Sequence, residues 1–245
     1  MTNDNPKREL NVGRSAIMYN TFLFDADNTL YDFDAACAHA LEVLLAEHEY
    51  LYTPAIFDLF VKIGTPLWQS LECGKLSDVD LQRLRMTQLF AELGLSGDPL
   101  EFNARFLHEL GRGEFYIEGA LDICEKIVAS GKRLYIVTNG FLATYESRVK
   151  HLALEKFVTE CFVSEVIGHK KPSREFFDHV FARISPVDKG KVLLVGDSLT
   201  ADIAGGIAAG VDTCWFNMYG VENVMGVVPT YEIRSLWEVE EYINV

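Results

Sequence analysis

A membrane-spanning helix needs about 20 apolar residues in a row, and the sequence has no apolar run near that length. Its first segment, Met1 to Ser15, is polar and has no apolar centre, which argues against a secretory signal peptide. We expect residues 1–17 to form a flexible tail, or to precede a natural start at Met18. Together these absences predict a cytoplasmic protein that contacts no membrane.

Basic residues are scarce. The chain has 22 Lys and Arg residues against 36 Asp and Glu residues, so its net charge is −14 at pH 7. No basic patch offsets the repulsion between this charge and a phosphate backbone. We therefore expect no nucleic-acid partner, and any anionic ligand must be attracted by charges within its own site.

Cysteine is present, but in no arrangement that predicts chemistry. None of the five cysteines belongs to a C-x-x-C pair, so the sequence does not predict a thiolate zinc site. Each lies in an apolar stretch, which is typical of a small buried side chain in a reducing compartment. They are Cys37, Cys73, Cys124, Cys161 and Cys214.

What the sequence does contain is a short apolar run that ends on two acids. Phe22 to Phe24 has the composition of a buried parallel strand, and Asp25 and Asp27 follow it. Ligands of open α/β sheets bind beyond the carboxyl ends of the strands, so both carboxylates can serve one site. Asp25 is a candidate nucleophile and metal ligand, and Asp27 is a candidate general acid and base whose backbone carbonyl can also reach a metal. The alternative is a polar turn that caps the next helix.

Apolar runs and helical patterns alternate through the second half of the chain, which predicts a parallel sheet with right-handed crossovers and helices on both faces. The expected strands cover residues 132–137, 160–164, 191–195, 212–216 and 230–233, and the expected helices cover residues 118–130, 142–151, 173–184 and 200–209, with a last helix from 235. A chain of 245 residues suits one such α/β domain with a smaller insert.

The stretch between the first two core strands contains no convincing strand. One helical pattern starts at Asp34, and others cover residues 54–63, 66–71, 78–93 and 98–110. A crossover between parallel strands usually holds a single helix. We therefore interpret residues 34–111 as a helical cap domain, and residues 18–33 with 112–245 as the core domain. The alternative is that these helices simply pack on the sheet.

Three further strand ends have polar signatures, which are Thr138-Asn139-Gly140, Lys171-Pro172, and Gly196-Asp197-Ser198 followed by Asp202. The order D-x-D-x-T, T-N-G, G-x-x-K-P and G-D-S-x-x-x-D resembles the haloacid dehalogenase (HAD) superfamily of phosphohydrolases, whose motifs are all present and in order. That resemblance implies a Rossmann-like α/β fold with a C1-type helical cap, inserted after the first motif and closing over the active site.

Longer stretches are similar to the YjjG-type pyrimidine 5′-nucleotidases in particular. They are Phe24 to Leu30, Thr65 to Trp68, Ile136 to Phe141 and Thr213 to Asn217, and the resemblance runs from Met18 to the C-terminus. It implies a Mg²⁺-dependent phosphatase that hydrolyses nucleoside 5′-monophosphates, such as dUMP, dTMP or UMP, through an aspartyl-phosphate intermediate.

The resemblance also implies the metal ligands. Asp25 and Asp197 would bind Mg²⁺ through their carboxylates, and Asp27 through its backbone carbonyl. Asp202 either orients the groups of the site or stabilises the N-terminus of its helix. True haloacid dehalogenases have no aspartate at the position of Asp27, so this residue favours phosphate-ester chemistry over carbon–halogen cleavage.

The phosphate would be bound by the second and third motifs. We expect the Thr138 hydroxyl and the backbone N–H groups of Asn139 and Gly140 to contact phosphate oxygens, although Asn-Gly can also merely build a turn. Lys171 would offset the charge of the anion. The resemblance selects Lys171 because it directly precedes the proline, and we expect its neighbour Lys170 to be solvated.

The expected partner is a small phosphomonoester, and the cap would choose among such compounds. Trp68, Phe33, Tyr31 and Tyr116 are candidate stacking surfaces for a base, although an aromatic residue in a helical cap is more often part of its core. The alternatives are a phosphatase for sugar phosphates or phosphoglycolate, a phosphomutase, and a non-catalytic binding module, the last disfavoured because no motif residue is missing. Either a monomer or a homodimer is compatible with the sequence.

Overall fold

The computed structural model describes residues 19–72 and 74–243, so the tail expected over residues 1–17 lies outside it. The core of the fold is a six-stranded sheet with the order β3-β2-β1-β4-β5-β6, in which every neighbouring pair is parallel. The strands are β1 (Thr21–Phe24), β2 (Arg133–Thr138), β3 (Glu160–Val163), β4 (Val192–Gly196), β5 (Asp212–Phe216) and β6 (Tyr231–Ile233).

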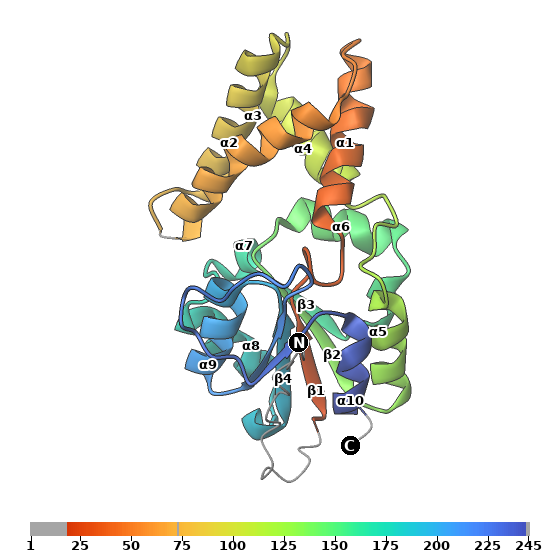
Figure 1. The fold of residues 1–245 in the computed structure, drawn as a ribbon, viewed down its shortest axis with the longest axis vertical. Helices are drawn as coiled ribbons and strands as arrows, with labels where there is room; N and C mark the ends of the chain where they lie inside the picture. The colour runs from red at the N-terminus through yellow and green to blue at the C-terminus, as the bar shows by residue number, and fades with distance from the viewer. Residues whose placement is uncertain (1–18, 73, 244–245) are drawn as a thin grey trace, which may run out of the picture.

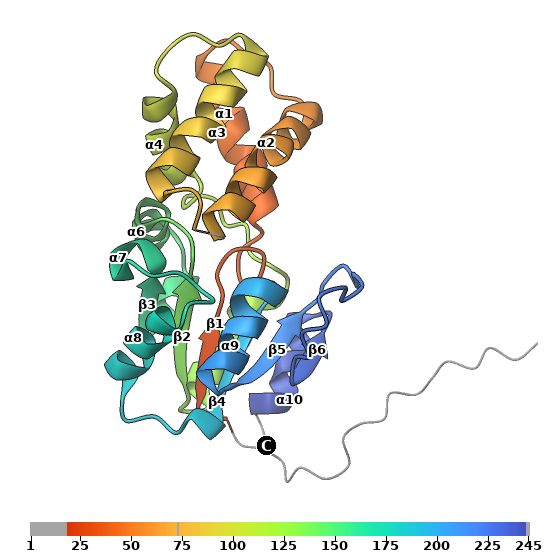
Figure 2. The ribbon, with the colours of Figure 1, turned by 90° about the vertical axis from the view of Figure 1, so that its left-hand side faces the viewer.

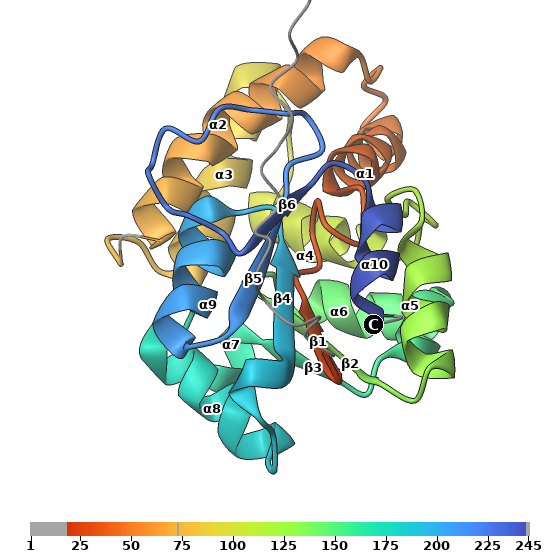
Figure 3. The same ribbon diagram turned by 60° about the horizontal axis from the view of Figure 1, so that its bottom comes forward.

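Two apolar layers cover the two faces of this sheet. Because side chains alternate along a strand, Phe22 and Phe24 of β1 belong to one layer and Leu23 belongs to the other. Figure 3 shows helices α5 (Ala120–Ala129) and α10 (Glu240–Ile243) on one side of the sheet, and α8 (Arg174–Ile184) and α9 (Ala204–Ala209) on the other. The Rossmann-like α/β fold with helices on both faces is thus confirmed.

The remaining helices of this part are short or lie near the carboxyl edge of the sheet. They are α6 (Leu142–His151), α7 (Ser164–Ile167), the 3₁₀ turns Leu154–Phe157, Lys189–Lys191 and Leu236–Val239, and the π-helical turn Leu199–Ile203 that precedes α9. The helix expected over residues 142–151 and the strand expected over 212–216 match the observed bounds. Within the described ranges, no helix is long and apolar enough to cross a membrane.

Four helices stand beyond the carboxyl ends of the strands (Figures 1 and 2). They are α1 (Phe33–Glu47), α2 (Pro54–Glu72), α3 (Asp78–Leu93) and α4 (Pro99–Glu109). Buried side chains such as Leu41 and Phe106 give them an apolar core of their own. Because α1 follows β1 almost directly, the four helices lie above the strand ends. The boundaries of a cap domain at residues 34 and 111 stay a prediction.

One expected boundary is wrong, because Pro66 does not interrupt its helix. The sequence predicted two helices, over residues 54–63 and 66–71, whereas α2 is continuous. Proline has no N–H to donate to the carbonyl one turn earlier, so it usually breaks or kinks a helix. Pro66 lies on the exposed side of α2, where water can hydrogen-bond that carbonyl. The break is therefore not required.

The cysteines are placed as their apolar surroundings predicted. Cys37, Cys124 and Cys214 are buried, Cys161 is half-buried, and all four are free thiols. Cys73 lies outside the described residues.

Candidate active site

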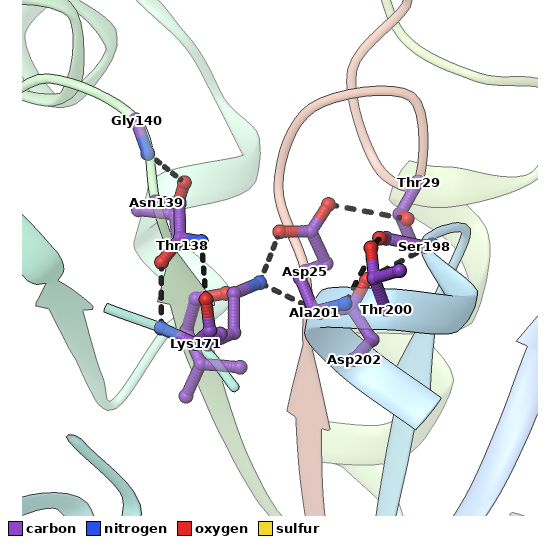
Figure 4. A network of polar contacts seen from close by, with 11 residues as sticks. Asp25, Thr29, Thr138, Asn139, Gly140, Lys171, Ser198, Thr200, Ala201 and Asp202 are labelled. Atoms are coloured by element: carbon purple, nitrogen blue, oxygen red, sulfur yellow. Dashed lines mark hydrogen bonds and ion pairs between the residues drawn. The ribbon is translucent and has the colours of Figure 1, made fainter. Parts of the chain in front are cut away.

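The predicted site residues converge at the carboxyl edge of the sheet. Asp25 follows β1, Thr138 ends β2 and Asp197 follows β4. Lys171 comes from the loop between α7 and α8 and reaches the same point (Figure 4). In the strand order, β1 lies between β2 and β4, where the direction of the crossovers reverses. Open α/β sheets bind their ligands at this switch point.

Lys171 is the centre of the polar network. Its side chain is buried, and Nζ donates to Asp25 Oδ1 at 2.6 Å and to Asp202 Oδ1 at 2.7 Å. A third hydrogen bond, to the Val137 carbonyl at 2.7 Å, uses the last N–H of the ammonium. Burial alone would lower the pKa of Lys171, but Asp202 and Asp25 raise it above its ordinary value. The lysine is therefore held charged and in one orientation.

Asn139 fixes the backbone on which this lysine stands. Its side-chain Nδ2 donates to the Lys171 carbonyl, and the Lys171 N–H donates to its Oδ1, both at 2.9 Å. The pair of hydrogen bonds joins the end of β2 to the loop before α8. We expected only the backbone of Asn139 to act at the site, so this side-chain role is an addition.

Three carboxylates crowd around the lysine. Oxygens of Asp25, Asp197 and Asp202 all lie within 4.8 Å of one another. Burial, opposed by Lys171, raises the pKa of Asp25 to about 7. Burial and the charges of Asp25 and Asp202 raise the pKa of Asp197 well above its ordinary value. One ammonium does not balance three crowded acids, two of them buried, so the donor set suits a divalent cation, which prefers oxygen ligands.

Because Gly196 has no side chain, the Asp202 side chain of the same motif can lie against it. A Cβ at Gly196 would lie 2.3 Å from Cγ of Asp202. With glycine there, Asp202 Oδ2 accepts a hydrogen bond from the Ser198 N–H at 3.1 Å. Ser198 in turn accepts from the Ala201 N–H at 3.0 Å and so caps the following turn. Asp202 thus spans Lys171 and the start of its own helix, a geometry that is compatible with both roles considered for it.

The T-N-G motif lies against Asp27. Thr138 is buried, and its Oγ1 accepts a hydrogen bond from the Gly140 N–H at 2.9 Å. A Cβ at Gly140 would lie 3.1 Å from both Thr138 Oγ1 and Asp27 Oδ2, which is tighter than ordinary contact. The glycine therefore makes room for the Asp27 carboxylate as well as forming a turn.

Asp27 is held by an arginine that the sequence did not single out. Arg148 of α6 is buried, and its Nη2 donates to Asp27 Oδ1 at 2.5 Å. Its guanidinium also lies 3.9 Å from the ring centroid of Tyr31, whose hydroxyl donates to Glu155 at 2.7 Å. Burial would lower the pKa of Arg148, but its interactions with Asp27, Tyr31 and Glu155 together raise the pKa above its ordinary value. The carboxylate of Asp27 is thus fixed by a buried charge.

A cavity of about 250 Å³ separates these groups from the cap. The side that belongs to the core includes Asp25, Asp27, Lys171 and Asp197. The side that belongs to the four cap helices is mainly apolar and is formed by Phe33, Trp68, Leu71, Arg85, Leu107 and Leu110. The cavity therefore joins a charged end at the strands to an apolar end at the cap.

The aromatic candidates divide into two groups. Phe33, Trp68 and Tyr31 line the cavity, and the Trp68 ring lies 5.8 Å from that of Phe141. Tyr116 packs behind Tyr31 at 5.7 Å, and its hydroxyl accepts from a backbone N–H. Tyr31 has one face covered by Arg148, so Trp68 and Phe33 are the better placed to contact a ligand.

The expectation that Lys170 is solvated is wrong. Its Nζ lies 2.5 Å from Asp78 Oδ2 at the start of α3, and its side chain is only 20% exposed. The attraction of a cap carboxylate draws the lysine out of solvent and joins the core to the cap. Of these two neighbouring lysines, Lys171 is the one that donates a hydrogen bond to Asp25.

Two buried arginines were missed, Arg148 and Arg85. Arg148 lies in the last turn of a helix, where a basic residue is favoured by the helix dipole whatever its function. Arg85 could have been found, since it lies four residues from both Leu81 and Leu89 and so falls on their buried stripe. Arginine is seldom fully buried, so an arginine on the apolar stripe of a helix indicates a specific role.

The strand-end acids, the buried lysine and the helical cap define a class of α/β hydrolases. The chain belongs to the haloacid dehalogenase-like hydrolases, whose family model matches residues 19–210. The family predicted from the sequence is therefore confirmed.

Individual relatives match over nearly the whole chain. It is 38% identical to the HAD-hydrolase YfnB of Bacillus subtilis, covering 93% of this chain and 96% of YfnB. It is 36% identical to the pyrimidine 5′-nucleotidase PynA of Streptococcus pneumoniae, covering 93% and 96%. It is 29% identical to the pyrimidine 5′-nucleotidase YjjG of Escherichia coli, covering 92% and 98%. A crystal structure of YfnB bound to magnesium superposes with a TM-score of 0.84, covering 93% of this chain and all of that one (100%).

Proposed function

We propose that this protein is a Mg²⁺-dependent phosphatase for nucleoside 5′-monophosphates, with pyrimidine nucleotides as its main substrates. The observation that carries the proposal is the placement of Asp25 beside Lys171, with Asp27 two residues further along the same loop. A nucleophilic carboxylate, a fixed positive charge and a second acid are the groups that phosphomonoester hydrolysis requires. The pyrimidine 5′-nucleotidases PynA and YjjG support the choice of substrate.

Three residues would hold the metal. These are the carboxylates of Asp25 and Asp197 and the backbone carbonyl of Asp27. Bound there, Mg²⁺ would supply charge neutralisation, which lets an anionic nucleophile approach an anionic phosphate. The excess of buried carboxylates over positive charge supports this assignment, as does the magnesium in the related YfnB structure.

The reaction would proceed in two displacements. A carboxylate oxygen of Asp25 attacks phosphorus, the P–O bond to the sugar breaks, and the departing 5′-oxygen takes a proton from the Asp27 carboxyl. Asp27, now ionised, removes a proton from water, whose oxygen attacks phosphorus. The bond from phosphorus to Asp25 then breaks, which releases inorganic phosphate and restores both acids.

The other motif residues would bind the phosphate. Lys171 places its charge against the developing negative charge of the transferred group, while Asp202 and Asn139 keep it there. The Thr138 hydroxyl and the backbone N–H groups of Asn139 and Gly140 would contact the phosphate oxygens. Arg148 would keep the Asp27 carboxylate oriented toward the leaving oxygen.

The cap would enclose the rest of the substrate. Residues 34–111 form this domain in our proposal, and their apolar wall suits a flat base better than a second charged group. A phosphatase for sugar phosphates or phosphoglycolate is the alternative, since the same core would serve either. A cytoplasmic location and a monomeric or homodimeric state stay predictions from the sequence.

Phosphate release tests the proposal. The substrates are dUMP, dTMP, UMP and dAMP beside ribose 5-phosphate and phosphoglycolate, each assayed with Mg²⁺ and with EDTA. We expect selective turnover of pyrimidine nucleotides that EDTA abolishes. Preference for a sugar phosphate would leave the core chemistry standing and overturn the nucleotidase assignment. Absence of turnover on every compound would overturn both.

A further inference from the structure

Arg85 is a fully buried cation on the cap side of the cavity. It belongs to α3 and is 1% exposed, on the same helical stripe as Leu81 and Leu89. Its guanidinium lies over two aromatic rings, 4.8 Å from the centroid of Phe60 and 5.4 Å from that of Phe106. These contacts fix the plane of the guanidinium, but they satisfy none of its N–H groups in the plane.

Two donor atoms of this arginine lack acceptors. Among the side chains that the structure describes, those of residues 19–71 and 74–243, neither Nε nor Nη2 of Arg85 has a hydrogen-bond partner, and no ion pair includes it. Burial lowers its pKa to about 10, opposed only by the nearby Cys37. A buried charge without a partner is costly, and native proteins seldom keep one unless a ligand pairs with it.

The position of Arg85 suggests which part of a ligand would complete it. Arg85 lines the same cavity as Asp25 and Lys171, but it stands on the opposite, cap side with Leu107 and Leu110. The phosphate end of a substrate would be bound at Lys171. The group that reaches Arg85 is therefore the far end of the leaving group, in surroundings that are otherwise apolar.

We infer that Arg85 is the residue by which the cap recognises the base, through donation of guanidinium N–H groups to a carbonyl oxygen of a pyrimidine ring. This inference rests on the nucleotidase function proposed above. Every pyrimidine base has such an oxygen, whereas adenine has none and a bare pentose phosphate has no base at all. An apolar wall beside a fixed fork of donors suits a flat, neutral ring with an acceptor on its edge.

The unsatisfied donors of Arg85 should make the rate depend on the substrate. A nucleotide that pairs with Arg85 relieves an unsatisfied buried donor, and a compound without a base leaves it unsatisfied. The wild-type enzyme should therefore favour dUMP over deoxyribose 5-phosphate in kcat/KM. Removing the donors should reduce this ratio, because only one of the two substrates uses them.

The test compares kcat/KM for dUMP, deoxyribose 5-phosphate and phosphoglycolate in the wild-type enzyme and three variants. Arg85→Met keeps the length and apolar contacts of the side chain but has no N–H donors. Arg83→Met is the matched control, because Arg83 lies on the exposed side of the same helix and pairs with Asp80. Arg85→Lys carries the same comparison should the methionine variant fail to fold, since it keeps the charge and loses the planar pair of donors.

We expect Arg85→Met to lower kcat/KM for dUMP about tenfold or more, mostly through KM, and to leave deoxyribose 5-phosphate nearly unchanged. Arg83→Met should change neither. If Arg85 had a purely structural role, Arg85→Met would lower kcat/KM for both substrates together, and that result would overturn the inference. So would a loss confined to phosphoglycolate, which would identify a carboxylate as the partner. A wild-type enzyme without preference for dUMP would instead refute the proposed function itself.

Discussion

Arg148, which is buried, forms an ion pair with the half-buried Asp27, with Nη2 of the arginine 2.5 Å from Oδ1 of the aspartate. The pair connects α6 to the loop that follows β1. It places a guanidinium behind the acid that is proposed to exchange protons with the leaving group and with water. The position of Asp27 is thereby set by α6, the helix that follows the T-N-G motif, and not by its own loop alone.

Arg148→Met should lower kcat because it frees the carboxylate of Asp27. General acid–base catalysis is worth about 10²- to 10⁴-fold, so loss of its orientation should cost about 10- to 100-fold in kcat. KM should change less, because Arg148 does not contact the phosphate in our proposal. Steady-state kinetics on dUMP measures both. Lys150→Met, on the exposed side of the same helix, is the control, and wild-type kcat in Arg148→Met would refute the positioning role.

Lys171→Met should affect both stability and activity. It leaves the buried Asp25 and Asp202 without their shared cation, and breaking a buried pair of this kind costs about 3–5 kcal/mol. We expect a clear fall in the midpoint of urea unfolding and a loss of turnover of about 10³-fold or more. Lys170→Met loses only a partly exposed pair with Asp78, worth about 1 kcal/mol or less, and should keep most of its kcat. Similar losses in the two variants would refute the choice of Lys171.

Mg²⁺ should stabilise the folded protein in the absence of substrate. A ligand at 100 times its Kd adds about 2.7 kcal/mol to the free energy of unfolding, which should raise Tm by several degrees in a chain of this size. Asp197→Asn should abolish the Mg²⁺-dependent rise, because it removes one of the crowded carboxylates. Asp178→Asn, at an exposed position on α8, should retain it. Thermal unfolding with and without Mg²⁺ tests this, and an undiminished shift in Asp197→Asn would exclude that acid as a ligand.

Gly196→Ala should be destabilising although the change is a single methyl group. The new Cβ would lie 2.3 Å from Cγ of Asp202, so either β4 or the acid must move. Overpacking of this kind costs about 1–3 kcal/mol, and here it would also disturb Lys171. Gly190→Ala is a matched control, because its Cβ would meet only Asp188 Oδ1 at 3.4 Å. Equal unfolding midpoints for the two variants would show that Asp202 can shift freely.

Much of the fold could be predicted because each strand is a short apolar run followed by a polar turn. The periodicity of Asp78–Leu93 and Leu142–His151 gave the observed helix bounds, since both have distinct ends. The helix break expected at Pro66 was wrong because the effect of a proline depends on which side of the helix it occupies. That side is set by packing of α2 against α3. Sequence periodicity does not contain this information.

The candidate site could be predicted as a set of residues but not as a network. The strand ends brought Asp25, Asp27 and Asp197 to one edge of the sheet, because parallel strands end together, and the family resemblance assigned Lys171 to the same site. The pairing of Arg148 with Asp27 depends on a contact between residues 121 positions apart, which no local pattern records. The role of the Asn139 side chain depends likewise on where the loop before α8 lies.

The assignment of Asp25 as the nucleophile is tested most directly by the rate of phosphate release from dUMP by Asp25→Asn in the presence of Mg²⁺. The substituted amide would keep the shape of the side chain but could not form an acyl phosphate, so we predict a loss of turnover of about 10³-fold or more with a native circular dichroism spectrum. Asp34→Asn, which changes an exposed acid in the first turn of α1, should behave as the wild type. An Asp25→Asn enzyme with unimpaired kcat would contradict the nucleophile assignment on which the mechanism depends.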